Sequence, residues 1–275
     1  RTVYRTPLLA WALLLAPVSA LAAEPLPPVD RAYLSIGHYR SANDLTGRWD
    51  AADGSLGTRF GFQRDLGFDD AHQALHWNAG LAIGGERRHK LEFFGYGYDD
   101  TSQRSIERSL QIGDEVYPIH ASLAGNLDVD IQGLSYTWFF LQDGRQAMGF
   151  GMGAVRYDLG LGLVASLQVQ DESVTVRQRL REHAWAPLLR VEYVRSLSPH
   201  WRWGVAAAYV TKPGGEITGE AIDAQARLEW FPWKHAGLSL RYNHNSVDLD
   251  FRRRRYDGGL DLETRGLQLA MMLRF

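Results

Sequence analysis

Two histidine–serine pairs have the residue types and spacing that a hydrolytic site needs. His244 and Ser246 are two residues apart, and so are His120 and Ser122. Residues two apart on a β-strand share a face, so the histidine could act as general base for the serine hydroxyl. Glu263, one segment later, could orient His244. The sequence therefore offers His244, Ser246 and Glu263 as a candidate catalytic set, although such pairs also arise by chance.

A larger group of charged residues alternates with apolar residues along several segments, so that the charges share one strand face. Its members are Glu92, Asp128, Asp130, Arg190, Glu192, Asp223, Arg227, Glu229 and Arg241. Both signs occur, with six acidic and three basic residues. If the strands close into a barrel, these residues point inward, where they either pair and fill the interior or line a narrow wet pore.

Four consecutive arginines, Arg252, Arg253, Arg254 and Arg255, form the densest positive run of the chain. Guanidinium groups bind phosphate oxygens well, so the run predicts a contact with phosphorylated lipid. The alternative is a solvated loop that is extended by its own repulsion.

Other chemistries find little support. The nine histidines are not spaced as metal ligands, so we expect no metal site and no cofactor. The alternating glycines 149, 151 and 153 precede no helix, so they are not a phosphate loop. The absence of cysteine excludes disulfides and thiol catalysis, and a formal net charge of −2 gives no argument for nucleic acid.

Alternating apolar and polar residues predict an all-β chain, and residues 222–230 alternate without a fault. We expect strands at about 31–41, 56–65, 74–83, 87–99, 124–141, 146–162, 183–196, 200–212, 220–231, 235–248 and 261–275. A closed antiparallel barrel with both chain ends on one side needs an even number of strands. The prediction is therefore a single antiparallel transmembrane β-barrel of 10–12 strands, with twelve favoured.

The connections alternate between short turns and long segments, as do the periplasmic turns and extracellular loops of such barrels. The long connections are 99–122, 164–182 and 249–259, which places the arginine run outside the cell. Aromatic residues gather beside the short turns and predict an interfacial girdle. Its tryptophans are Trp138, Trp201, Trp203, Trp230 and Trp233.

The apolar parity changes inside two of the expected strands, at Gln132–Gly133 and near Val155–Arg156. A β-bulge shifts parity by one residue, and glycine often accompanies it. Alternatively, both segments leave the membrane at this point, where lipid no longer requires the alternation.

The N-terminal segment predicts a secretory signal peptide over residues 1–22, with cleavage after Ala22. Residues 23–30 contain three prolines and predict an extended periplasmic lead-in. The barrel is then expected to occupy residues 31–275.

The C-terminal alternation of Leu267, Leu269, Met271, Leu273 and Phe275 resembles the assembly signal of Gram-negative outer-membrane β-barrels. Three further stretches are similar to a functionally uncharacterised group of proteobacterial barrels, namely DLGFDD at 65–70, RHKLE at 88–92 and SLQIGDEVYP at 109–118. The resemblance implies a cell outer-membrane location. It also implies contact with outer-membrane lipid, lipopolysaccharide and the barrel assembly machinery.

We therefore expect a non-enzymatic, monomeric outer-membrane barrel: a narrow channel, a small-solute or lipid-binding barrel, or a structural surface protein. One alternative is a lipid A-modifying hydrolase that uses His244, Ser246 and Glu263. Another is a surface adhesin that acts through the segments 99–122 and 164–182.

Overall fold

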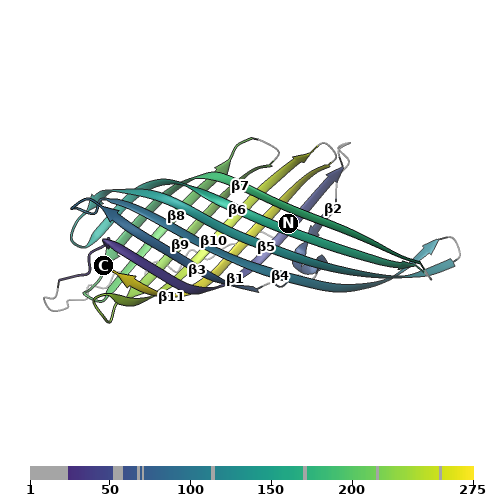
Figure 1. Cartoon of the computed structure of the whole chain (residues 1–275), viewed down its shortest axis with the longest axis horizontal. Coiled ribbons are helices and arrows are strands. Elements are labelled where there is room, and N and C mark those ends of the chain that lie inside the picture. The colour runs from purple at the N-terminus through teal and green to yellow at the C-terminus, as the bar shows by residue number, and fades with distance from the viewer. Residues whose placement is uncertain are drawn as a thin grey trace, which may run out of the picture.

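The chain folds into one closed, antiparallel β-barrel, in which each strand pairs with its neighbours and β11 pairs back with β1 (Figure 1). This computed structural model describes residues 24–51, 58–66, 69, 71–112, 115–169, 172–214, 217–253 and 256–275. The predicted signal peptide, residues 1–22, lies outside the described residues.

The strands are bounded as follows: β1 (Ala32–Ala51), β2 (Thr58–Gly61), β3 (Ala71–Ile83), β4 (His89–Ile112), β5 (Glu115–Gln142), β6 (Gln146–Val169), β7 (Glu172–Ser196), β8 (Trp201–Lys212), β9 (Ile217–Trp230), β10 (Ala236–Arg253) and β11 (Tyr256–Arg274).

The barrel has ten wall positions rather than twelve, because β2 and β3 share one of them. β2 pairs with residues 46–49 of β1, and β3 pairs with residues 32–42 of the same edge, both antiparallel. The expected strand at 56–65 is therefore only a short piece of an interrupted wall strand, and the preference for twelve strands was wrong. The segment 31–41, whose place the sequence left open, belongs to the wall strand that closes the barrel against β11.

The interruption between β2 and β3 begins with a π-helical segment, Phe62–Leu66. Phe62 is buried against Leu45 and packs beside Leu260 and Leu262. The side chain of Gln63 accepts a hydrogen bond from the Leu45 amide and donates one to the Asn43 carbonyl, both at 3.2 Å. These bonds to the β1 backbone replace part of the ladder that the wall loses here.

One end of the barrel has short turns, and at the other end β4 to β7 extend far beyond the other strands (Figure 1). The turn between β5 and β6 is fixed by Asp143, whose carboxylate accepts hydrogen bonds from the Arg145 amide at 2.7 Å and the Gln146 amide at 2.9 Å. These bonds hold the pKa of the Asp143 carboxyl below its ordinary value. The expected long loops at 99–122 and 164–182 are mostly β-hairpin, because strand pairing continues to Ile112–Glu115 and Val169–Glu172.

The outer and inner faces exchange polarity part of the way along the barrel. On β10, the outward residues Leu240 and Tyr242 are apolar, but the outward Asp248, further from the short turns, is charged. The inward residues reverse in the opposite sense, from Arg241 to Val247. A broad band of exposed apolar side chains indicates an apolar medium, so the lower part of the barrel lies in lipid and the upper part in water.

This exchange explains the parity changes that the sequence shows. The β5–β6 ladder has no register shift at Gln132–Gly133 or at Val155–Arg156, so the predicted bulges were wrong. Val129 and Val155 face inward because the interior has become apolar at this level. The outward side chains Asp128 and Asp130 are exposed, so their predicted inward position was also wrong.

The exposed apolar belt encircles the end of the barrel that carries the short turns. Every wall position contributes to it, for example through Leu34, Leu75, Phe93, Leu134, Phe150, Val191, Tyr209, Ile222, Leu240 and Leu269. The predicted girdle residues lie on the outer surface near these turns, with Trp201 stacked on Trp230 at 6.0 Å between ring centres. Among the described residues no helix is long and apolar enough to cross a membrane.

The belt predicts an unequal response to an added charge on one strand. Leu240→Arg places a cation among lipid tails and should lower the free energy of unfolding by roughly 2–4 kcal/mol. Asp248→Arg lies on the same face above the belt, opposite Asp261 on the β11 ladder, and should leave stability unchanged or slightly raised. Urea unfolding in lipid vesicles measures both variants. Equal losses would show that the belt does not end between these two residues.

Candidate functional site

A short motif recurs on three strands and supplies most of the charge inside the barrel. Lys90 and Glu92, Arg190 and Glu192, and Arg227 and Glu229 each flank one apolar residue. The two charged residues of each motif point inward together, while the apolar residue between them faces out. The three strands thus bring cations and anions to adjacent levels of the lumen.

Glu192 is the centre of this network, and its side chain is completely buried. It accepts hydrogen bonds from Lys90 Nζ and from Arg227 Nη2, each at 2.7 Å. Arg227 Nε is also 3.1 Å from Glu229. Buried charges are stable only when paired, so this part of the lumen is held as one interlocked set.

Glu92 forms the second anion of the network. It lies 3.1 Å from Lys90 Nζ and 3.8 Å from Arg190 Nη2, and it accepts a short hydrogen bond from the Tyr33 hydroxyl. Asn78 in turn donates a hydrogen bond to Tyr33 at 3.4 Å. The closing strand β1 is thereby tied to the charges on β4.

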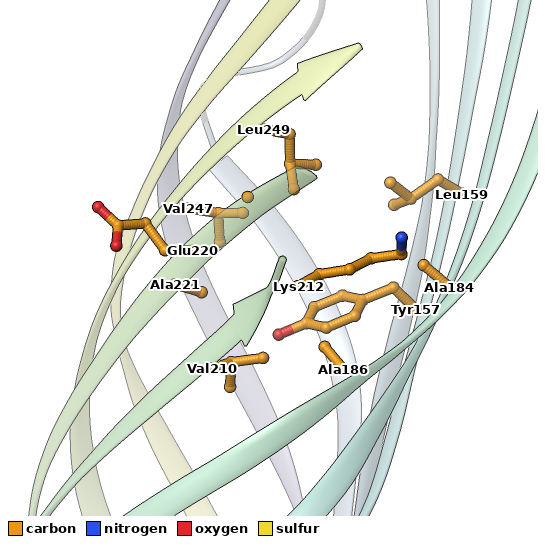
Figure 2. A pocket seen from close by; sticks show the side chains of 11 residues that line it. Tyr157, Leu159, Ala184, Ala186, Val210, Lys212, Glu220, Ala221, Val247 and Leu249 are labelled. Atoms are coloured by element: carbon orange, nitrogen blue, oxygen red, sulfur yellow. The ribbon is translucent and has the colours of Figure 1, made fainter. Parts of the chain in front are cut away.

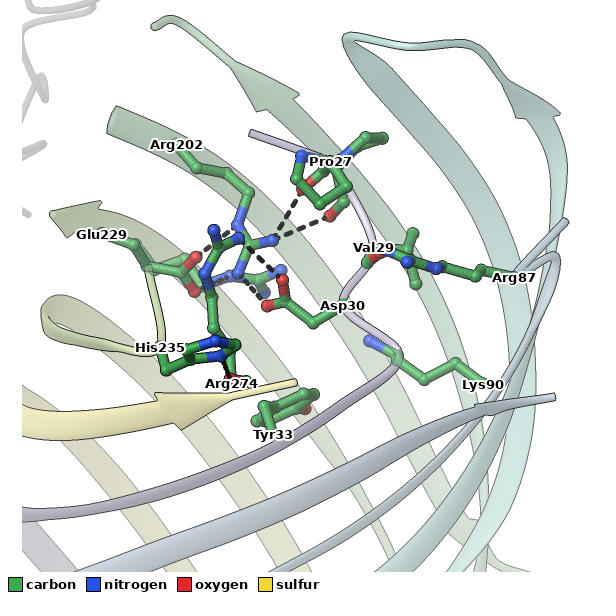
Figure 3. A network of polar contacts seen from close by, with 12 residues as sticks. Pro27, Val29, Asp30, Tyr33, Arg87, Lys90, Arg202, Glu229, His235 and Arg274 are labelled. Carbon is green, nitrogen blue, oxygen red and sulfur yellow. Dashed lines mark hydrogen bonds and ion pairs between the residues drawn. The ribbon is translucent and has the colours of Figure 1, made fainter. Parts of the chain in front are cut away.

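The lead-in segment crosses the short-turn end of the lumen and is held there by two arginines (Figure 3). Arg202 Nη2 is 2.6 Å from Asp30, its Nε is 2.6 Å from Glu229, and its Nη1 donates to the Pro27 carbonyl at 2.9 Å. Arg274 Nη1 approaches the other oxygen of Asp30 at 3.1 Å.

Apolar packing completes this closure. Leu26 is buried with Phe231 and Met272, and Val29 is buried in a cluster with Phe139. The guanidinium of Arg274 lies 4.6 Å from the Phe231 ring centre, within the range of cation–π attraction. The segment that the sequence described only as an extended lead-in is therefore a plug of the barrel end.

Above the plug network lies a cavity with a mixed lining, which borders about 820 Å³ of space that is partly open to solvent. Its polar side includes Arg190, Asp223, Arg241 and His76. His76 is itself hydrogen bonded to the buried amide of Gln268 at 2.9 Å.

A second, apolar cavity continues the lumen upward and borders about 550 Å³ of space, also partly open (Figure 2). Tyr157, Val210 and Ala221 line both cavities, so the two are contiguous. Leu159 and Val247 extend the apolar wall, and Lys212 brings charge to its rim, whereas the Glu220 side chain points outward and accepts a hydrogen bond from the Tyr209 hydroxyl. The lumen therefore combines an apolar chamber with a charged floor.

Seven of the predicted interior charges face the lumen, and Asp128 and Asp130 are the two that do not. The prediction missed Lys90, Arg202, Arg274 and Asp30. Lys90 and Arg202 share the inward parity of the predicted set, so the alternation already contained their signal. Arg274 also has the inward parity, opposite to that of Leu273 and Phe275, whereas Asp30 could not be found this way because the plug segment precedes the first strand.

The structure brings the candidate hydrolytic residues together on the outer face rather than in the lumen. His244 Nδ1 is 4.0 Å from Glu263 Oε1, and Ser246 is the direct ladder partner of Glu263. All three lie just above Tyr242, the last apolar residue of the belt on this strand. This places them at the level of lipid head groups. His120 and Ser122 lie in β5, but the orientation of their side chains is outside what the structure describes.

The remaining predicted sites lie on β10 and β11. Arg252 and Arg253 end β10, whereas Arg254 and Arg255 lie outside the described residues, so phosphate binding stays a prediction. The C-terminal residues of the expected assembly signal are all exposed on the outer face: Leu267, Leu269, Met271, Leu273 and Phe275. The Phe275 amide donates to the Ala32 carbonyl at 2.8 Å, which seals the barrel seam. Among the described residues no cluster of histidine and acidic side chains could hold a metal ion.

No protein-family model and no curated protein sequence matches the chain. Similar solved structures are bacterial outer-membrane barrels. The outer membrane protease OmpT from Escherichia coli is 9% identical, with a TM-score of 0.49 over 94% of this chain and 99% of that one. A FadL homologue from Pseudomonas aeruginosa is 10% identical, with a TM-score of 0.40 over 90% and 91%. The translocator domain of NalP from Neisseria meningitidis is 10% identical, with a TM-score of 0.42 over 88% of each chain.

The plug network predicts a large stability effect from one arginine. Arg202→Met leaves Asp30 and Glu229 buried without their main cation and should lower the free energy of unfolding by about 3–5 kcal/mol. Arg195→Met removes an exposed arginine from the outer face at the same end and should change it by less than about 0.5 kcal/mol. Urea unfolding in vesicles compares the two, and equal stability would mean that the plug does not support the barrel.

Proposed function

We propose that this outer-membrane barrel binds a small, largely apolar solute in its lumen and is not a permanently open pore. The observation that carries the proposal is the contiguous lumen, in which an apolar chamber lies above a floor of paired charges. Small-molecule sites are typically concave and mostly apolar, with a few polar groups that fix orientation. This chamber has that composition.

The closed floor supports binding rather than free conduction. Arg202, Glu229 and Asp30 are buried and mutually bonded across the short-turn end, so an ion that passed would have to displace them. The apolar chamber above would also give no hydration to a passing ion. A solute that enters from the long-hairpin end would instead come to rest on the charged floor.

The proposal is tested with 1-decanol added to the protein in lipid nanodiscs, followed by methyl NMR. The signals of Val247 and Leu249, which line the chamber, should shift in a saturable way. The signal of Leu240, which faces lipid, reports non-specific partitioning and should change only linearly. If the chamber signals follow the lipid-facing signal, the lumen does not bind the solute.

Two tryptophan variants provide a matched control on one strand. Ala221→Trp fills the chamber and should abolish the saturable shift. Ala224→Trp adds the same side chain on the outward face and should leave binding intact. Should both variants bind decanol like the original chain, the binding site is not this chamber.

A second candidate function is hydrolysis of a lipid ester at the outer face. The approach of His244 to Glu263 and the placement of Ser246 opposite Glu263 favour it. Ser246 Oγ would attack the ester carbonyl while His244 takes its proton and passes it to the departing alkoxide. Water would then release the fatty acid from the serine ester. The site's level beside the lipid belt suits a glycolipid such as lipid A.

Incubation of the protein with purified lipid A tests this candidate. Mass spectrometry should detect a released fatty acid with the original chain. The amount released should fall by roughly a hundredfold or more with Ser246→Ala, as expected for loss of a nucleophile. Lipid A that stays intact with the original chain would remove the hydrolase and leave lumen binding unaffected.

A further inference from the structure

Arg241 differs from the other cations of the lumen. It lines both the plug cavity and the mixed cavity above it, yet its side chain makes no hydrogen bond and no ion pair with any residue that the structure describes. Lys90, Arg202, Arg227 and Arg274 each have a carboxylate within 3.1 Å. Glu92 and Asp223 attract Arg241 only from beyond ion-pair distance, and a guanidinium without a direct partner in a confined site is unfavourable, so it indicates a place for an anion.

The charge balance of this part of the lumen gives the same result. The cations are Lys90, Arg190, Arg202, Arg227, Arg241 and Arg274, and the anions are Asp30, Glu92, Glu192, Asp223 and Glu229. The six cations exceed the five anions by one. Asp223, the anion nearest the chamber, hydrogen bonds with Asn245 and attracts Arg190 and Arg241 electrostatically, but it forms no direct ion pair with Arg241 among the described residues. One negative charge would complete the set.

A second donor faces the same cavity. Arg190 is about 94% buried, and its Nε has no hydrogen-bond acceptor, because its carboxylates are 3.7 and 3.8 Å away. Its other two nitrogens can donate to the Gln225 amide oxygen at 3.1 and 3.2 Å. The cavity is therefore bordered by two guanidinium groups, neither of which has a carboxylate closer than 3.7 Å, and carboxylate is an anion that such groups bind well.

The apolar chamber directly above Arg241 determines the chemical character of the rest of the ligand. Tyr157, Val210 and Ala221 connect it to the cavity of Arg241, and the polar residues Asn243, Asn245 and Asp223 line the wall between that cation and the chamber. From Arg241 to Leu249 the strand rises about 26 Å along its length, at roughly 3.3 Å per residue. An alkyl chain of medium length therefore fits above the cation.

We infer that the lumen takes an amphipathic monocarboxylate, with its acid group at Arg241 and Arg190 and its apolar chain in the chamber. This inference rests on the proposed solute binding and adds the chemical class of the solute. A neutral alcohol would leave Arg241 without a direct ion-pair partner. A long-chain ammonium would meet two guanidiniums of like charge.

The test compares decanoate, 1-decanol and decyltrimethylammonium at about pH 8 in nanodiscs, where the carboxylic acid is fully ionised. The Val247 and Leu249 methyl signals are the readout. Decanoate should bind roughly tenfold more tightly than decanol, or better, as expected for a charge-assisted contact, and the ammonium should bind more weakly than decanol. Arg241→Gln should remove this preference, so that decanoate and decanol bind the variant with equal affinity. Arg40→Gln, which removes an exposed arginine on the outer face of β1, should have no effect.

The outcomes separate the inference from the proposal beneath it. Equal saturable binding of decanoate and decanol, or a decanoate preference that survives Arg241→Gln, would overturn the inference and keep the solute site. Failure of all three probes to shift the chamber signals in a saturable way would overturn both.

Discussion

The pairing of β1 with β11 is the constraint on which the rest of the molecule depends. In lipid each backbone amide and carbonyl must be paired within the protein, so the sheet has to close. The seam runs without a register shift from Tyr33–Arg274 to Ala51–Tyr256. β1 begins at the seam, and the segment that precedes β1 lies in the lumen. Asp30 of this segment therefore comes within reach of Arg274, which lies on the other side of the seam. Closure and plugging thus have one structural origin.

Closure also decides what the interior must contain. A ten-strand barrel is too wide to be filled by small side chains alone, and long charged residues fill it at the plugged end. Those charges lose their water, which they tolerate only as an interlocked set such as that around Glu192. Arg241 is left over where this set meets the apolar chamber. The proposed ligand site therefore lies where the paired charges of the plugged end meet the apolar chamber.

Much of this architecture could be predicted from the sequence, because alternation is a local signal. The strand around Ile222–Trp230 and the inward position of Arg227 and Glu229 follow directly from it. The strand count did not follow, because β2 and β3 share one wall position through pairing with β1, and no local pattern shows that. The prediction that Asp128 and Asp130 point inward was wrong for another reason. Parity tells which residues share a face, but the medium outside decides which face is apolar, and that medium changes along the strand.

The exchange of polarity between the two faces has a consequence for how the barrel sits in the bilayer. If it moved outward, Leu240 and Leu269 would leave the hydrocarbon; if it moved inward, Glu220 and Asp248 would enter it. Either displacement is unfavourable, and charges resist entry into lipid more strongly than apolar groups resist water. The row of outward acids therefore acts as a stop that fixes the immersion depth, and the β4–β7 hairpins are held at a constant height above the bilayer.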